Sequence, residues 1–387
     1  MENVEEAHAA SRRPAGLDVA AALALVATVV LHVVAMAPTY FTASGSLMSQ
    51  ADQATLYAIM AASWALALAI GLTGPHRTPV AAALAVGVAV TEMGFRAADL
   101  GDVFRYGSAS VGSGFWLMEA AWLVGAAGAL LAVLAARARH RSRTTPGASE
   151  PERVDLSELA LGVDWAAPVA AGEESPAVAM DDPTRAQRRS GDTSVLPVAA
   201  VTASEDAHER LAWTLLVVIL AALTAGAFLP AWDHAQATST ITGRSVSLDL
   251  GNAFSHQPWQ QVIGTVLAAL SMLAVPVVAV RWRDKAVGAA ATCGMLLVLG
   301  AQLASAVVQV DQPVPASDFG INSAQVQQLG LALSLKLTGW FTLDALAAYA
   351  LFAAVMVWAT LRLAHESSSG TAQSAPDLRS PAMPSAS

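Results

Sequence analysis

Eight long runs of apolar residues restrict what this chain can fold into more than any other feature of its sequence. Each run holds about twenty residues, the length that an α-helix needs to cross a hydrocarbon layer of roughly 30 Å. The runs therefore predict an all-α, polytopic membrane protein with about eight transmembrane helices. The expected spans are residues 17–36, 54–74, 80–98, 115–136, 211–229, 261–280, 286–308 and 338–360.

The composition agrees with a chain that lies in lipid. Charged residues make up 13% and hydrophobic residues 55% of the chain, whereas about a quarter of an ordinary soluble domain is charged. The net charge is -9, and the basic residues form short clusters beside the apolar runs instead of a stripe that could follow a phosphate backbone, so nucleic acid is not an expected partner. The single cysteine, Cys293, excludes a disulfide framework.

The basic residues predict how the chain is oriented. An even number of spans places both termini on one side, and cytoplasmic loops retain Lys and Arg. Only Arg105, Arg244 and Lys336 fall on the side opposite the termini. We therefore expect a multi-pass protein of the cell membrane with both termini cytoplasmic. The basic residues on the side of the termini are Arg12, Arg13, Arg77, Arg137, Arg139, Arg141, Arg143, Arg210, Arg281, Arg283, Lys285 and Arg362.

An internal repeat divides the apolar runs into two groups of four. Residues 114–120 (GFWLMEA) match residues 339–345 (GWFTLDA), which puts Glu119 and Asp344 in register. Because each group holds an even number of spans, the two repeats have the same orientation and form a tandem parallel repeat. The expected organisation is a cytoplasmic N-terminus at 1–16, a first four-helix repeat at 17–136, a disordered cytoplasmic linker at 137–209, a second four-helix repeat at 210–362 and a disordered cytoplasmic tail at 363–387.

Polar residues inside the spans are the candidate site, because charged groups are costly there, at about 2.5 to 3.5 kcal/mol each on insertion scales. Glu92 and Arg96 are spaced i, i+4, and Glu119 lies at a similar depth on the next helix, so Arg96 is expected to lie between two carboxylates. In the second repeat, Gln302 and Asp344 form the matching pair. This intramembrane polar set comprises His32, Glu92, Arg96, Glu119, Gln302 and Asp344.

Two interpretations of the intramembrane polar set stay open. It could form a pocket on the outer face in which an acid takes up a proton or binds a cationic group. Alternatively, its members are polar contacts between helices, worth only about 0.6 kcal/mol each, and this interpretation is favoured. If the parallel repeats associate about an axis normal to the membrane, Glu119 and Asp344 should both point into the bundle near that axis, with Arg96 the nearest cation to Glu119. Their helices could then face each other across the axis.

No cofactor, metal site or catalytic residue can be assigned. A haem of the b type needs axial ligands that face each other, and His32 is the only histidine well inside a span. Asp233, His234 and His256 share one external loop, but their spacing matches no known zinc site. A glycine-rich phosphate loop, an H-E-x-x-H motif and a G-x-S-x-G elbow are all missing, so nothing in the sequence supports an enzyme.

The sequence favours a non-enzymatic membrane protein that acts as a scaffold, a sensor or an accessory subunit. The alternative is a small-solute or proton-coupled transporter, which needs a polar path reaching the inner leaflet, whereas the inner halves of the predicted helices are almost wholly apolar. Besides the lipid bilayer, the expected contact is a protein partner, bound through the cytoplasmic linker or the extracellular loops. The two long loops of the second half, at 231–259 and 309–336, suggest that this half meets something outside the membrane, although they can also be tolerated insertions.

Overall fold

The computed structural model describes residues 2–42, 45–144, 198–248, 259–282, 284–310 and 322–373. The chain divides into two units, of which the first combines Met1–His140 with Arg210–Ser387 and the second is Arg141–Glu209. The arrangement below concerns the first unit, which holds all the helices that could cross a membrane.

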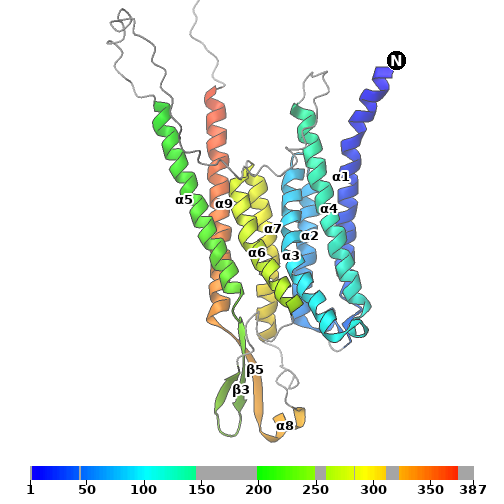
Figure 1. The fold of residues 1–387 in the computed structure, drawn as a ribbon, viewed down its shortest axis with the longest axis vertical. Coiled ribbons are helices and arrows are strands. Elements are labelled where there is room, and N and C mark those ends of the chain that lie inside the picture. Colours follow the sequence, from blue (N-terminus) through cyan, green and yellow to red (C-terminus); the bar gives the residue numbers. More distant parts are fainter. Residues whose placement is uncertain are drawn as a thin grey trace, which may run out of the picture. The chain divides into compact units, whose positions relative to one another are not determined.

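Eight helices within the described residues are long and apolar enough to cross a membrane (Figure 1), so the prediction of eight spans in an all-α protein is confirmed. Their ends differ from the expected ones by a few residues. The apolar spans are Gly16–Ala35, Ala51–Leu72, Thr78–Gly101, Ser113–His140, His208–Phe228, Gln261–Arg281, Lys285–Val310 and Gly339–Leu361. They belong to the helices α1 (Glu2–Ala35), α2 (Ala51–Leu72), α3 (Thr78–Tyr106), α4 (Ser113–Thr144), α5 (Val198–Phe228), α6 (Trp259–Arg281), α7 (Lys285–Val310) and α9 (Gly339–Gln373).

The strands and short helices lie in the loops at one end of the spanning helices, which we call the strand end. The other end, with the turns that follow α2 and α6, is the opposite end. The strands pair as β1 with β2 and as a three-stranded antiparallel sheet in the order β4, β3, β5. The loop elements are β1 (Thr39–Phe41), β2 (Gly45–Ser46), η1 (Leu47–Ser49), η2 (Ser108–Ser110), β3 (Asp233–Ser239), β4 (Ser245–Leu248), α8 (Ser323–Gln328) and β5 (Leu331–Leu337).

The first four helices meet the later ones through α3, which packs against α6 and α7, and through α2, which packs against α7. Glycines bring these backbones together: a Cβ atom on Gly94 would lie 2.5 Å from the backbone nitrogen of Ala268, and one on Gly264 would lie 2.3 Å from that of Ala98. Figure 1 shows α4 and α9 on opposite sides of this contact. The expectation that the helices of Glu119 and Asp344 face each other was therefore wrong, because close approach occurs where small residues permit it.

Two large apolar cores and a small cluster of Ala21, Ala82 and Ala132 hold the spanning helices together. The first is built from α1 to α4 around the fully buried side chains of Trp64, Phe115 and Met118, and it extends onto α7. The second joins α5, α6, α7 and α9 around Met295 and Trp358, among others. Because α7 contributes to both cores, the two groups of helices form one packed body.

The sheet of β3, β4 and β5 ties the end of α5 to the start of α9. Asp233 of β3 pairs with Leu337 of β5, directly before α9. At the base of the sheet, Thr338 donates its backbone N–H to the carbonyl oxygen of Trp232 (2.7 Å) and its hydroxyl to that of Ala231 (2.7 Å). The Trp232 ring also packs edge-on against Phe341, with 5.9 Å between ring centroids. The sheet is thus joined rigidly to two spanning helices.

Helical structure extends into the expected linker and tail. Helix α4 continues to Thr144, α5 begins at Val198 and α9 ends at Gln373. The remainder of the predicted disordered linker, 145–197, and of the predicted disordered tail, 374–387, lies outside the described residues.

Candidate functional site

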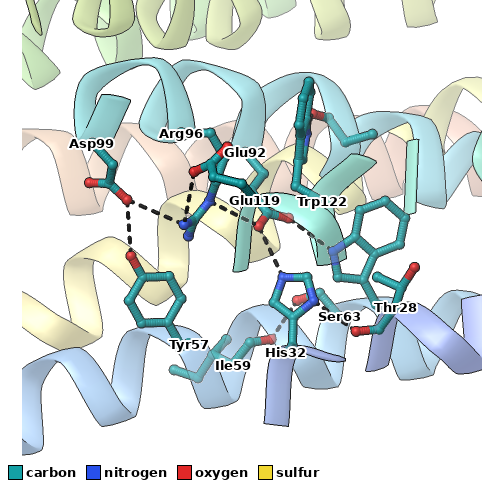
Figure 2. Close-up of polar contacts among 12 residues, drawn as sticks. Thr28, His32, Tyr57, Ile59, Ser63, Glu92, Arg96, Asp99, Glu119 and Trp122 are labelled. Atoms are coloured by element: carbon teal, nitrogen blue, oxygen red, sulfur yellow. Dashed lines mark hydrogen bonds and ion pairs between the residues drawn. The ribbon is translucent and has the colours of Figure 1, made fainter. Parts of the chain in front are cut away.

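Seven polar side chains near the strand end form one connected set of contacts, which we call the Arg96 network; Figure 2 labels all of them except Tyr40. Four spanning helices and the strand β1 contribute to it. The side chains of His32, Glu92 and Arg96 are almost wholly buried. The members are His32 (α1), Tyr40 (β1), Tyr57 (α2), Glu92, Arg96 and Asp99 (α3) and Glu119 (α4).

Glu92 lies at the buried end of the network. Its Oε1 is 3.0 Å from Nε2 of His32, and its Oε2 accepts a hydrogen bond of 2.9 Å from the indole N–H of Trp64. The other ring nitrogen of His32, Nδ1, is 2.9 Å from the carbonyl oxygen of Thr28. A carbonyl oxygen can only accept, so Nδ1 carries a hydrogen and donates it. The side chain of Glu92 is thus held from two neighbouring helices.

Arg96 is the centre of the network. Its Nη1 is 3.3 Å from Oδ2 of Asp99 and 3.7 Å from Oε1 of Glu119, and its Nε is 3.4 Å from Oε1 of Glu92. The guanidinium also stacks on the Tyr57 ring, at 4.8 Å from the ring centroid. These distances place Arg96 between Glu92 and Glu119. The buried cation is therefore compensated by three carboxylates, although its Nε makes no hydrogen bond within the described residues.

Two tyrosines connect Arg96 with Asp99. The Tyr40 hydroxyl accepts a hydrogen bond of 3.1 Å from Nη1 of Arg96 and donates one of 2.8 Å to Oδ2 of Asp99. Tyr57 donates to the same carboxylate oxygen over 3.2 Å. Burial, followed by the nearby Asp99 carboxylate, raises the pKa of Tyr40 well above its ordinary value, so this phenol keeps its proton and can act as a donor.

The structure brings together four residues of the predicted intramembrane polar set, namely His32, Glu92, Arg96 and Glu119. Gln302 and Asp344 lie apart from them, on α7 and α9. Asp344 is fully buried, and neither of its carboxylate oxygens has a hydrogen-bond partner among the described residues. The expected contact between Gln302 and Asp344 is thus not formed, which leaves Asp344 in an apolar setting.

Three members of the network and its indole donor were missed from the sequence. Asp99 lies just beyond the predicted end of the third span, although its i, i+3 spacing from Arg96 puts both on one face of α3. Tyr57 and Trp64 sit within an apolar run, where aromatic side chains are ordinarily packing residues. Tyr40 lies in a loop, and no local pattern indicates that this loop folds back onto α3.

No metal or ligand site emerges from the described part of the chain, in which no group of three His, Cys, Asp or Glu residues could hold a metal ion. Asp233 and His234, considered above as zinc ligands, lie in β3, and His256 lies outside the described residues. A groove of about 230 Å³ between α5 and α6 is lined by apolar residues alone, including Ala225, Val266 and Leu270. It has no polar group that could orient a substrate.

The network can bind protons and hold helices together, but it contains no arrangement of a nucleophile and a base. Nor does it offer a phosphate-binding or metal-assisted route to a reaction. Comparisons of the chain with protein-family models, with curated proteins and with solved structures found no match.

Proposed function

We propose that the protein is a non-enzymatic, multi-pass protein of the cell membrane that acts as a scaffold, a sensor or an accessory subunit. The observation that carries this proposal is that most polar groups of the Arg96 network bond to one another. Its cation and two of its three carboxylates have their partners within the network or on Trp64. When the polar groups of a site bond to one another, few of them are free to bind a solute. Such a site holds the structure together or responds to its surroundings.

The helices beneath the network give the second line of support. Buried hydroxyl groups there donate their hydrogens to their own helix: Thr28 to the carbonyl oxygen of Ala24 (2.8 Å) and Thr91 to that of Gly87 (2.9 Å). In the second half, Thr292 does the same with Gly288 over 3.2 Å. These three hydroxyl groups thus bond within their own helices and do not extend the network towards the opposite end. This pattern disfavours the alternative, a small-solute or proton-coupled transporter.

The proposed orientation puts the strand end outside the cell and both termini in the cytoplasm. Arg77, Arg139, Arg281 and Lys285 support it, since all four lie at the opposite end. In this arrangement, tandem parallel repeats at 17–136 and 210–362 flank a cytoplasmic linker, and a cytoplasmic tail follows them. In a background of Cys293→Ala, cysteines placed at Gly107 and Thr240 should react with an impermeant maleimide added outside, and a cysteine at His76 should not; the reverse pattern would overturn the orientation.

The sheet of the second half is the proposed partner-binding element. Three large apolar side chains on it are exposed, Ile241 (77%), Val246 (61%) and Leu329 (57%). Ile241 and Leu329 lie at the same tip, where the backbone N–H of Thr240 bonds to the carbonyl oxygen of Gly330 over 2.7 Å. Apolar groups exposed to water on a rigid loop structure are typical of protein contacts.

Affinity purification from native membranes, followed by mass spectrometry, tests this proposal. We expect one partner to be enriched by the wild-type protein and lost with the double variant Ile241→Asp, Leu329→Asp. Ala109→Asp is the matched control, because Ala109 is exposed at the strand end of the first half, and it should retain the partner. Loss of the partner with both variants would contradict a role of the sheet.

A transport assay separates the two candidate functions. Liposomes that contain the purified protein should remain as tight to protons and small solutes as liposomes without it. Uptake that depends on Arg96 would replace the proposed function with the transporter.

A further inference from the structure

The protonation state of the inner part of the Arg96 network follows from hydrogen-bond geometry. Nδ1 of His32 donates to the Thr28 carbonyl oxygen, and Nε2 faces Oε1 of Glu92 at 3.0 Å. A hydrogen must lie between these two atoms, so the pair is either an imidazolium with a carboxylate or a neutral imidazole with a carboxylic acid. Both forms have a net charge of zero. The pair therefore contributes no net charge to the network.

The remaining charges balance without Glu119. Arg96 carries one positive charge, and Asp99, which receives hydrogen bonds from Tyr40 and Tyr57, carries one negative charge. An ionised Glu119 would leave the network with a net charge of minus one inside the membrane, whereas a neutral Glu119 would leave it with none. Since an uncompensated charge is costly in this setting, Glu119 is the group whose protonation decides the net charge of the network.

Glu119 also differs from the other two carboxylates in its contacts. Its buried Oε1 has no hydrogen-bond partner among the described residues and has only the 3.7 Å ion-pair contact with Arg96. Its side chain is 17% exposed, compared with 28% for Asp99 and 0% for Glu92 and His32. Asp99, however, accepts hydrogen bonds from Tyr40 and Tyr57, whereas no donor among the described residues holds Oε1 of Glu119. Glu119 lies in the second turn of α4, near the strand end. Water at that end can therefore reach the carboxyl group.

We propose that Glu119 is a reversible proton-binding site served by the aqueous phase at the strand end. Binding a proton there neutralises the carboxylate and removes one of the counter-charges of Arg96. The same Nη1 atom also contacts Asp99 and the Tyr40 hydroxyl. The proton therefore acts on the contact between α3 and the loop that carries β1. This inference goes beyond the proposed function and does not depend on any partner.

The surroundings of Glu119 include every titratable group of the network. Arg96 is the cation that contacts Glu119, and the same Nη1 atom of Arg96 also contacts the carboxylate of Asp99. The groups that face Glu119 or its Arg96 partner are Arg96, Asp99 and Glu92 from α3, His32 from α1, Tyr57 from α2 and Tyr40 from β1.

Asp344 gives an internal comparison, since the sequence places it in register with Glu119. It is also buried in a spanning helix, but its side chain is fully buried and has no cation or hydrogen-bond donor beside it among the described residues. Without access to water it should not exchange protons on the same time scale. Asp344→Asn is therefore the matched control for Glu119→Gln.

Infrared difference spectroscopy on the purified protein in lipid tests the proposal. The carboxylic-acid C=O stretching band is followed while the pH is lowered from about 8 to about 6, where exposed carboxylates stay ionised. We expect one band to appear on acidification, to be lost in Glu119→Gln and to persist in Asp344→Asn. A band that is unchanged in Glu119→Gln, or no band in the wild-type protein, would overturn the proposal.

A conservative variant covers the case in which Glu119→Gln does not fold, as judged by gel filtration. Glu119→Asp keeps a carboxyl group, so its acid band should remain but move in frequency. An acid band at the wild-type frequency in Glu119→Asp would place the proton on another residue and overturn the proposal.

Discussion

Gly294 of α7 provides a direct test of how the two halves of the protein are joined. A Cβ atom at this position would lie 2.2 Å from the carbonyl oxygen of Leu84 and 2.9 Å from the backbone nitrogen of Val88, both in α3. Neither atom can rotate away, because both belong to the backbone of a helix. Gly294→Ala therefore requires α3 and α7 to separate by roughly 1 Å before the contact reaches an ordinary van der Waals distance.

The expected loss of stability is about 1–3 kcal/mol, the usual cost of forcing an extra carbon into a packed contact. Gly300 provides the control, because it lies on the same helix and a Cβ atom there meets nothing within 4 Å. Gly300→Ala makes the same chemical change and the same change in helix propensity, which favours alanine by about 1 kcal/mol. The difference in unfolding free energy between the two variants therefore measures the contact between the helices.

Reversible unfolding in mixed micelles, followed by circular dichroism, gives both free energies. Gly87 lies at the same crossing, with its Cβ position 2.0 Å from the carbonyl oxygen of Ala291. The double variant Gly87→Ala, Gly294→Ala should lose less than the sum of the single losses, because the first substitution already separates the helices. Equal stability of Gly294→Ala and Gly300→Ala would refute the proposed role of glycine at this crossing.

Other consequences can be measured by the same unfolding assay. Arg96→Leu should lower the free energy of unfolding by about 3–5 kcal/mol because it leaves buried carboxylates without their cation. Glu119→Gln should lower it by less than about 1 kcal/mol. Equal small losses would mean that the side chains act separately. Tyr40→Phe should cost about 1–3 kcal/mol through its lost hydrogen bonds, and Tyr349→Phe, on the lipid-facing side of α9, should change nothing. Burial raises the pKa of Asp233 in the folded protein above its value in the unfolded chain. Ionisation of Asp233 therefore lowers the stability as the pH rises through the unfolded pKa towards the folded pKa. Asp233→Asn should stabilise the protein at about pH 7, where the carboxyl group is ionised in the unfolded chain, and make no difference at about pH 3.

The spanning helices could be predicted because the signal for them is local. About twenty consecutive apolar residues are needed to cross lipid, and each run shows this without reference to any other part of the chain. The contact between Glu92 and Arg96 could be predicted for the same reason, since their spacing alone puts them on one face of α3. The strand β5 was missed, although Leu331, Leu333 and Leu335 alternate with smaller or polar residues as in a half-buried strand.

The pairing of helices could not be predicted, because it depends on two surfaces at once. Internal similarity suggested that α4 and α9 face each other, yet the halves meet where Gly94 of α3 and Gly264 of α6 allow the backbones to come close. Many glycines occur in the spans, and nothing local distinguishes those two from Gly300, which faces open space. The same limit applies to Asp344: Gln302 was expected to be its partner, but Asp344 has no hydrogen-bond partner among the described residues.

The hydrogen bonds between Thr338 and residues 231–232 connect the sheet rigidly to two long helices, so a movement of the sheet also moves α5 and α9. Helix α9 has 35 residues, which corresponds to a rod of about 52 Å at a rise of about 1.5 Å per residue. A tilt of about 5° imposed at the sheet would move the far end of that rod by about 4–5 Å. A ligand that binds the sheet and tilts it would thus move the ends of α5 and α9 on the other side of the bilayer. No ion or solute would have to cross the membrane.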